Sequence, residues 1–297
     1  ALTFTFSPSN YNGSNISCNG ENDGTITAIT SGGANGVDPN SYIWENSVAA
    51  IISTANATVS SLVADTYTVI ASDNNGCPFT DSYTMIEPDL LTTTTSAVSA
   101  LCDYSSDGSA TAIPSGGTPA YSYLWNASGQ ITQTATGLQG NGSTYNVTVT
   151  DINGCQAFGS AIVNSPPPII VSANVIDDPT CNGYNDGALS GIDAQPIATG
   201  GYSYSVDNGS GAVNIFNGSF SGLEAGLVDI IAEDVNGCIG TTTVTITDPP
   251  LLVPGLVILN SPACGTIADG VVLSSPNGGS GSTNYNFVWT DDNGNFP

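Results

Sequence analysis

Apolar and polar residues alternate along most of this chain, as they do in β-strands with one buried face. Clear examples are TYTVIASD at 66–73, TYNVTVTD at 144–151 and LVDIIAED at 227–234. Turn residues interrupt the alternation about every 8 to 12 positions, and no stretch keeps the 3.6-residue period of a helix. The pattern predicts an all-β protein of short antiparallel strands.

The same order of strands and turns recurs about every 80 residues, and a repeat of fixed period indicates tandem domains of one fold. Each copy opens with a Thr/Val/Ile-rich strand, and then comes a cysteine that Asp-Gly follows five residues later: CNGENDG (18–24), CDYSSDG (102–108), CNGYNDG (181–187) and CGTIADG (264–270). An aromatic strand and a D-x-N-G-C turn come next in the complete copies. Units of this length with about seven strands predict immunoglobulin-like β-sandwiches.

Proline ends the last strand of each complete unit and places the domain boundaries. We expect units at 1–88, 89–167, 168–249 and 250–297, of which the fourth lacks its second cysteine. Because almost no chain connects the units, we expect them to stack end to end into a rod. The incomplete fourth unit predicts a longer array.

A tryptophan marks the third strand in three of the units: Trp44, Trp125 and Trp289. We expect these side chains to pack in the sandwich cores, as a tryptophan on this strand does in immunoglobulin domains. The alternative is an exposed tryptophan that stacks on a sugar. Tyr67 and Tyr145 precede the alternating strand, where a tyrosine corner would lie.

The charge composition narrows the function, because the 297 residues include 25 acidic side chains and no lysine, arginine or histidine. Without cations the chain has no surface for phosphate groups, so we expect no nucleic-acid binding. Catalysis that depends on histidine or lysine is excluded as well, and we expect no enzyme activity. No apolar run reaches the roughly 18 residues of a membrane span, so we expect no membrane insertion.

Acidic residues recur at two positions of each complete unit. In the Asp-Gly and D-x-N-G-C turns, aspartate folds the turn by accepting backbone N–H groups, while glycine accepts positive φ. The Asn-Gly pairs predict type I′ hairpins. The alternative role is calcium binding through carboxylate oxygens where domains meet, and no other cofactor is expected. The candidate ligands are Asp23, Asp107, Asp186, Asp73, Asp151 and Asp234.

Seven cysteines lie at repeated positions without the spacing of a metal site. They indicate disulfides and therefore an extracellular compartment. The seven are Cys18, Cys77, Cys102, Cys155, Cys181, Cys238 and Cys264.

Three connectivities are open, and one of them consists of links of the Cys77–Cys102 type. The first joins the two cysteines of each unit: Cys18–Cys77, Cys102–Cys155 and Cys181–Cys238. In an immunoglobulin-like sandwich, however, these two turns lie at opposite ends, about 20 Å apart across a six-residue strand, whereas bonded cysteines need Cα atoms within about 7 Å. The preferred connectivity joins a turn to the hairpin of the next unit: Cys18–Cys155 and Cys102–Cys238. It leaves Cys77, Cys181 and Cys264 facing further units.

The succession C-x-G-x-x-D-G, Gly-Gly, Y-x-Y-x-W and D-x-N-G-C resembles the SprB repeat of Bacteroidetes surface proteins over nearly the whole chain. The second unit departs from the pattern at Tyr104, and the third lacks the tryptophan. The resemblance implies a very large adhesin that the type IX secretion system exports to the surface of a Gram-negative bacterium. In gliding species such an adhesin moves along the cell.

Two functions agree with these features. The first is the stalk of an extracellular filamentous adhesin, whose partners are neighbouring repeats and, through parts outside this sequence, surface polysaccharide or other cells. A hydroxyl-rich surface without any trypsin site and with disulfides favours it. The alternative is a set of carbohydrate-binding immunoglobulin-like modules in a secreted hydrolase, which would need exposed aromatic residues in a cleft.

Overall fold

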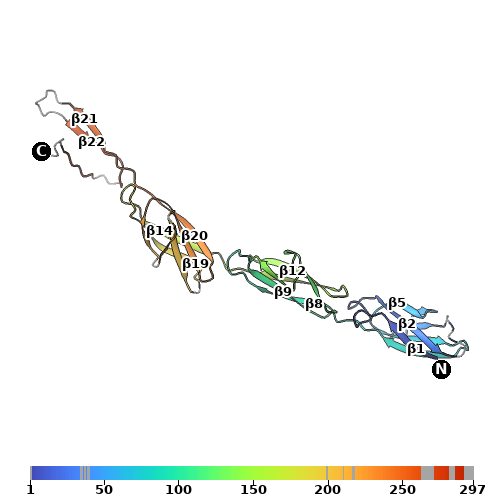
Figure 1. Ribbon diagram of the computed structural model, residues 1–297. Coiled ribbons are helices and arrows are strands. Elements are labelled where there is room, and N and C mark those ends of the chain that lie inside the picture. The colour runs from blue at the N-terminus through green and yellow to red at the C-terminus, as the bar shows by residue number, and fades with distance from the viewer. Residues whose placement is uncertain are drawn as a thin grey trace. The chain divides into compact units, whose positions relative to one another are not determined.

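The computed structural model describes residues 2–33, 36, 38, 41–198, 200–209, 211–215, 218–261, 271–280 and 285–290. All named elements in this part of the chain are β-strands, and all the strand pairs are antiparallel (Figure 1). The all-β prediction is therefore confirmed. The chain divides into two compact units, Ala1–Ser165 and Pro166–Pro297.

The first unit begins with a sandwich of seven strands. One sheet has the order β1-β2-β5 and the other the order β4-β3-β6-β7, which corresponds to strands A, B, E and C′, C, F, G of an immunoglobulin-like fold. Phe4 and Ile26 of the first sheet meet Trp44 and Val69 of the second in one core. The strands are β1 (Leu2–Pro8), β2 (Gly24–Gly32), β3 (Ile43–Glu45), β4 (Ile51–Thr54), β5 (Thr58–Leu62), β6 (Thr66–Ser72) and β7 (Pro78–Thr84).

The second sandwich of this unit has six strands, one fewer than expected. Its sheets have the orders β11-β9-β8 and β10-β12-β13. Between β10 and β11 the chain turns back through Gly129, whose N–H donates to Trp125 O at 2.7 Å, and no separate strand forms there. The strands are β8 (Thr92–Val98), β9 (Gly108–Ser115), β10 (Ser122–Trp125), β11 (Thr134–Leu138), β12 (Ser143–Thr150) and β13 (Gln156–Val163).

The second unit begins with a seven-stranded sandwich of the same topology as the first, with sheets β14-β15-β18 and β17-β16-β19-β20. Val206 lies in its core together with Leu189 and Ile230. A two-stranded sheet follows. The strands are β14 (Ile170–Asp177), β15 (Gly187–Gln195), β16 (Tyr202–Asp207), β17 (Val213–Ile215), β18 (Phe220–Leu223), β19 (Gly226–Asp234), β20 (Ile239–Ile246), β21 (Leu256–Asn260) and β22 (Val271–Ser274).

The three tryptophans do not share one environment. Trp44 and Trp125 are 0% exposed, and their indole N–H groups donate to backbone carbonyls, as buried indoles require. Trp289 is 38% exposed, so its prediction as a core residue is wrong. The cause is a missing neighbour. β6 and β12 pair with the strands of Trp44 and Trp125, whereas residues 285–290 pair with no strand in the described part of the chain.

The hairpin turns also differ from the prediction. A type I′ turn needs positive φ at both central residues, but in Asp73–Cys77 only Gly76 has it, at 80°. The N–H of Gly76 donates to Asp73 O at 2.8 Å, and the N–H of Asp73 donates to Cys77 O at 3.1 Å. The turn is therefore the three-residue kind that ends in a glycine bulge. Its equivalents at Gly154 and Gly237 follow the same pattern.

In the three Asp-Gly pairs that the structure describes, the glycine has a different role from the predicted one. Gly24, Gly108 and Gly187 are absent from the residues with positive φ. A Cβ atom on Gly108 would lie 2.4 Å from Val163 Cγ1, and one on Gly24 would lie 2.5 Å from Ile16 Cδ1. These positions need glycine because core side chains and carbonyls pack directly against the backbone.

Candidate functional site

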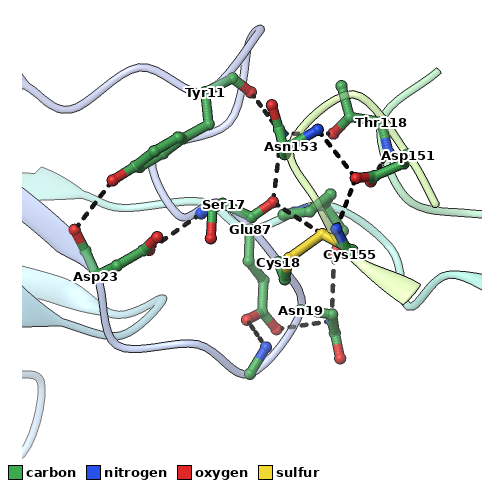
Figure 2. Close-up of a disulfide and its surroundings, with 12 residues drawn as sticks. Tyr11, Ser17, Cys18, Asn19, Asp23, Glu87, Thr118, Asp151, Asn153 and Cys155 are labelled. Atoms are coloured by element: carbon green, nitrogen blue, oxygen red, sulfur yellow. Dashed lines mark hydrogen bonds between the residues drawn. A yellow bond between two sulfur atoms is a disulfide. The ribbon is translucent and has the colours of Figure 1, made fainter. Parts of the chain in front are cut away.

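A disulfide joins the first two sandwiches. Cys18, in the loop between β1 and β2, bonds Cys155, at the tip of the β12–β13 hairpin, across a sequence separation of 137 (Figure 2). The two Cα atoms are 5.7 Å apart, within the range of ordinary disulfides. The structure thus has the junction pairing at this position.

The loop that carries Cys18 is anchored in the first sandwich. Ile16 is fully buried in the core, and the side chain of Asn15 accepts the N–H of Ile86 at 3.0 Å. Glu87, just after the last strand, accepts the N–H of Gly20 at 2.7 Å and the side-chain amide of Asn19 at 3.0 Å. The segment just after the last strand of the first sandwich, at residues 86 and 87, therefore holds the cysteine turn in place.

Asp151 shapes the hairpin that carries Cys155. Its side chain is 5% exposed, and its Oδ1 atom accepts the N–H groups of Asn153 at 3.0 Å and Cys155 at 2.9 Å. Oδ2 accepts the N–H of Thr118 at 2.7 Å. Since the chain has no basic side chain, these N–H groups are what stabilises a nearly buried carboxylate.

Asn153 connects the two sandwiches beside the disulfide (Figure 2). Its Nδ2 atom lies 3.2 Å from Tyr11 O and 3.3 Å from Ser17 O, both in the first sandwich, and 3.1 Å from Thr118 Oγ1 in its own. Its Oδ1 atom accepts the amide of Asn12 at 2.7 Å. One half-buried side chain therefore bonds the cysteine turn, the loop before it and the second sandwich.

Asp23 closes the cysteine turn on the first sandwich. It accepts the N–H of Ser17 at 3.1 Å. Partial burial raises the pKa of this carboxyl, but hydrogen bonds from Ser17 outweigh burial and hold the pKa below its ordinary value of 3.8. The charged form of Asp23 is therefore the one that the folded turn favours.

The other aspartates of both turn types act in the same way within their own sandwiches. Asp107 accepts from Leu101 N at 3.1 Å, and Asp186 from Thr180 N at 2.9 Å. Hydrogen bonds lower the pKa of both groups. Asp73 and Asp234 each accept two N–H groups of their hairpins, as Asp151 does.

The six candidate calcium ligands are thus all engaged with their own turns. Among the described residues no three acidic, cysteine or histidine side chains are grouped so that they could hold a metal ion. The fourth Asp-Gly pair, at 269–270, lies outside the described residues. Calcium binding stays a prediction, and the arrangement favours turn formation as the role of these carboxylates.

The pairing within units is wrong. Cys155 is bonded to Cys18 rather than to Cys102. Cys77 and Cys181 are exposed free thiols, so Cys18–Cys77, Cys77–Cys102 and Cys181–Cys238 do not form. The reason is that the first turn and the last hairpin lie at opposite ends of a sandwich. Cys102–Cys238 would join the two compact units and stays a prediction. Cys264 lies outside the described residues.

Sequence reasoning missed three residues of this junction: Asn12, Thr118 and Asn153. Local pattern identifies Asn153 only as the first residue of an Asn-Gly turn. Its distinguishing feature is that it recurs two residues before every hairpin cysteine, which places its side chain next to whatever that cysteine bonds. Thr118 follows the Gly-Gly pair of its unit and could not be connected to the hairpin by local pattern.

No helix able to cross a bilayer is found in the part of the chain that the structure describes. No curated protein sequence matches the chain. Among solved structures, the three N-terminal domains of the Highly Immunogenic Outer Capsid protein of bacteriophage RB49 are 16% identical, with a TM-score of 0.40 over 84% of this chain and 99% of that one. A Ca²⁺-stabilized adhesin, described as helping an Antarctic bacterium to bind ice, is 15% identical, with a TM-score of 0.37 over 82% of this chain and 73% of that one.

The family comparison agrees with the sequence motifs. The model of the SprB repeat matches residues 10–49 and residues 94–130. Each segment contains a Cys…Asp-Gly turn, a Gly-Gly pair and a tryptophan strand, and the first contains the cysteine that forms the junction disulfide. The resemblance is confirmed for these two segments, which lie in the first two sandwiches and match the SprB repeat.

Proposed function

We propose that the chain is a stalk segment of a large extracellular adhesin, in which disulfides between successive SprB repeats resist mechanical load. The observation that carries the proposal is the Cys18–Cys155 bond between two different sandwiches. Its role is structural and needs no catalysis or cofactor. Adhesion to surface polysaccharide or to other cells is assigned to other parts of the protein.

The bond changes the path of a pulling force. Once folded contacts yield, tension that enters at residue 18 crosses the sulfur atoms and leaves at residue 155. The residues between them stay slack. A noncovalent junction would instead let both sandwiches extend completely. Such a bond suits a protein that is loaded outside the cell, where disulfides persist.

The family likeness supports the remaining parts of the proposal. We infer export by the type IX secretion system and display on the surface of a Gram-negative bacterium of the Bacteroidetes, with gliding motility as the process served in motile species. The complete lack of lysine and arginine supports an extracellular location, because trypsin-like proteases have no cleavage site in this chain.

The alternative of carbohydrate-binding modules is less well supported. Stacking on a sugar needs an exposed aromatic face, and Trp44 and Trp125 are completely buried. Their indole N–H groups are also used by backbone carbonyls of their own sandwiches. These two residues therefore serve the cores, and Trp289, at 38% exposed, is the one tryptophan whose side chain is open to a sugar.

The test is single-molecule pulling between handles at the two ends of a chain that carries Cys102→Ser in every sample, so that the predicted Cys102–Cys238 bond does not contribute to the extension. The oxidised chain should extend by roughly 480 Å less than the reduced chain, from a separation of 137 residues at about 3.5 Å each. Cys18→Ser should show the long extension under oxidising conditions, and Cys77→Ser should behave as the unchanged protein. Equal extension of the oxidised chain and Cys18→Ser would refute the load-bearing role.

Surface display needs its own test. Antibodies against residues 1–165 should label intact cells of the source bacterium, and deletion of its type IX secretion genes should abolish the signal. Labelling that requires lysis of the cells would contradict extracellular display while leaving the mechanical role of the bond intact.

A further inference from the structure

An apolar groove lies beside the free thiol of Cys181 in the second unit. Its volume is about 590 Å³, and its walls include Cys181, Leu252, Tyr285, Phe287 and Trp289. These residues come from the cysteine turn of the third repeat and from the fourth repeat. The groove therefore lies within one compact unit, at the place where two repeats meet.

The second sandwich shows what occupies the equivalent place there. Its Gly-Gly turn is held by two bonds: Gly117 N donates to Asp89 O at 2.8 Å, and Tyr121 Oη donates to Gly116 O at 2.6 Å. The next residue along the chain, Thr118, donates its N–H to Asp151 of the D-x-N-G-C hairpin. That hairpin carries Cys155 to the cysteine turn of the preceding repeat.

The fourth repeat has the same two hydrogen bonds around its Gly-Gly turn. Gly279 N donates to Pro250 O at 2.7 Å, and Tyr285 Oη donates to Gly278 O at 2.9 Å. A Cβ atom on Gly278 would lie 2.1 Å from Leu251 O, just as one on Gly116 would lie 2.1 Å from Leu90 O. The Gly-Gly turn against which a D-x-N-G-C hairpin would pack is therefore already formed in the fourth repeat. Ser280 has the position in it that Thr118 has in the second sandwich.

The apolar side chains around the Gly-Gly turn of the fourth repeat are exposed to solvent. Leu91 of the second sandwich is 6% exposed, whereas Leu252, its counterpart two residues after Pro250, is 51% exposed. Trp289 is 38% exposed, whereas Trp125 is buried. Residues 285–290 also lack a paired strand in the described part of the chain. Apolar surface beside a segment that has no described strand partner suits an added β-structure.

The thiol of Cys181 completes the comparison. It occupies the same place in its turn as Cys18, which is bonded to a hairpin cysteine, but Cys181 is free and exposed. Its turn is formed in the same way: Asp186 accepts Thr180 N, and Asp248 accepts Gly183 N at 3.2 Å, as Glu87 accepts Gly20 N. The turn that carries Cys181 therefore already has the conformation in which Cys18 forms its disulfide.

We propose that this groove is the receptor for a β-hairpin of the SprB-repeat type, two alternating strands joined by D-x-N-G-C, and that the hairpin cysteine bonds Cys181. One strand pairs with residues 285–290 and covers Trp289. The hairpin aspartate accepts the N–H of Ser280. The inference rests on the geometry of the junction and not on the adhesin function.

The covalent step is an oxidation that a small-molecule disulfide can support. The hairpin thiol first forms a mixed disulfide with it. The Cys181 thiolate then attacks the hairpin sulfur, a new S–S bond forms, and the small thiol leaves and takes up a proton. The two electrons lost by the two cysteines reside on the reduced small molecule.

The probe is a peptide of residues 143–163 of this chain, with Cys155 supplied as its mixed disulfide with glutathione. It is added to the oxidised full-length chain, and attachment is located by mass spectrometry after cleavage at acidic residues. Docking raises the effective concentration of the peptide, so Cys181 should be modified at least about tenfold faster than Cys77. Glutathione disulfide alone should show no such preference.

Two controls separate docking from thiol reactivity. Trp289 fluorescence should shift to the blue when the peptide binds, also in Cys181→Ser, and the shift should be absent in Trp289→Phe. A peptide with Asp151→Ala should bind about tenfold more weakly, since it loses an acceptor for the Ser280 N–H. A peptide of the same composition in scrambled order should bind at neither site.

Attachment at Cys77 or Cys264 in preference to Cys181 would overturn the proposal. So would equal labelling by the scrambled peptide, or labelling of Cys181 without any change in Trp289 fluorescence. None of these results would alter the pulling behaviour expected for the Cys18–Cys155 bond, so the two proposals fail separately.

Discussion

At the scale of single residues, the junction depends on amides and carboxylates that local sequence rules treat as turn formers. Asn153 is the clearest case, since the same side chain that suits a turn also reaches Tyr11 and Ser17 of the other sandwich. Turn propensity explains why asparagine is tolerated at this position. Only the neighbouring sandwich explains what the amide does.

Replacing Asn153 by Ala should destabilise the first unit. The variant leaves Tyr11 O and Ser17 O without this donor, and we expect a loss of about 1–3 kcal/mol in the free energy of unfolding. Guanidinium titration followed by tryptophan fluorescence measures it. Asn75→Ala is the matched control, because Asn75 holds the same motif position on an exposed hairpin, and it should change stability by less than about 0.5 kcal/mol. Equal losses of unfolding free energy in the two variants would show that the Asn153 side chain does not stabilise the junction.

The turn aspartates should make the protein sensitive to acid. The folded-state pKa of Asp23 is lowered, so the stability from its charged form is present above the unfolded-state pKa and is lost as pH falls through the folded value, below 3.8. Asp107 and Asp186 act in the same direction.

Thermal denaturation between pH 2 and 6 tests this expectation. Asp23→Asn should flatten the fall in melting temperature below pH 3.8 while lowering stability near neutral pH. Glu21→Gln, a change of charge at an exposed residue of the same turn, serves as the control. If the melting temperature of Asp23→Asn fell at low pH as it does in the unchanged protein, groups other than Asp23 would cause the acid transition.

At the scale of strands and turns, alternation predicted the elements well, because a half-buried strand is recognisable from its own residues. β6 (Thr66–Ser72), β12 (Ser143–Thr150) and β19 (Gly226–Asp234) lie where the alternating segments predicted them. Turn geometry was less predictable. Asn-Gly suits two kinds of hairpin, and the N–H groups that donate to the preceding aspartate favour the three-residue kind.

The glycine that opens β9 (Gly108–Ser115) gives an element-scale prediction. A methyl group on Gly108 would meet Val163 Cγ1 at 2.4 Å and Leu138 O at 3.0 Å. Gly108→Ala should therefore destabilise the second sandwich by about 1–3 kcal/mol through overpacking. Ser109→Ala, at the next and half-exposed position, should be nearly neutral. Chemical denaturation of both variants measures the difference, and a neutral Gly108→Ala would mean that the strand shifts without cost.

At the scale of the whole molecule, the disulfide pairing was the main open question. Cysteine positions repeat identically in each unit, so both connectivities suit the sequence pattern. The end-to-end distance within a sandwich decides against the pairs inside a unit, and the contact between sandwiches places Cys18 and Cys155 together.

Loss of this bond should destabilise the first unit as a whole. Cys18→Ser removes a cross-link that spans 137 residues, and we expect a loss of about 2–5 kcal/mol in guanidinium unfolding. Cys77→Ser, which removes an exposed free thiol, should leave the unfolding midpoint unchanged. A Cys18→Ser midpoint equal to that of the unchanged protein would show that the bond restricts motion without adding stability.

The sequence by itself determined the all-β class, the repeat, the strands and the family, because these follow from the period of apolar residues and from motifs that recur along the chain. Tertiary structure decided the rest. Which cysteines meet and what Asn153 bonds depend on contacts between different repeats, and Trp289 is exposed because no described strand pairs with residues 285–290. A pattern that is the same in every repeat carries no information about which repeat lies next to which surface, and only the packed chain supplies it.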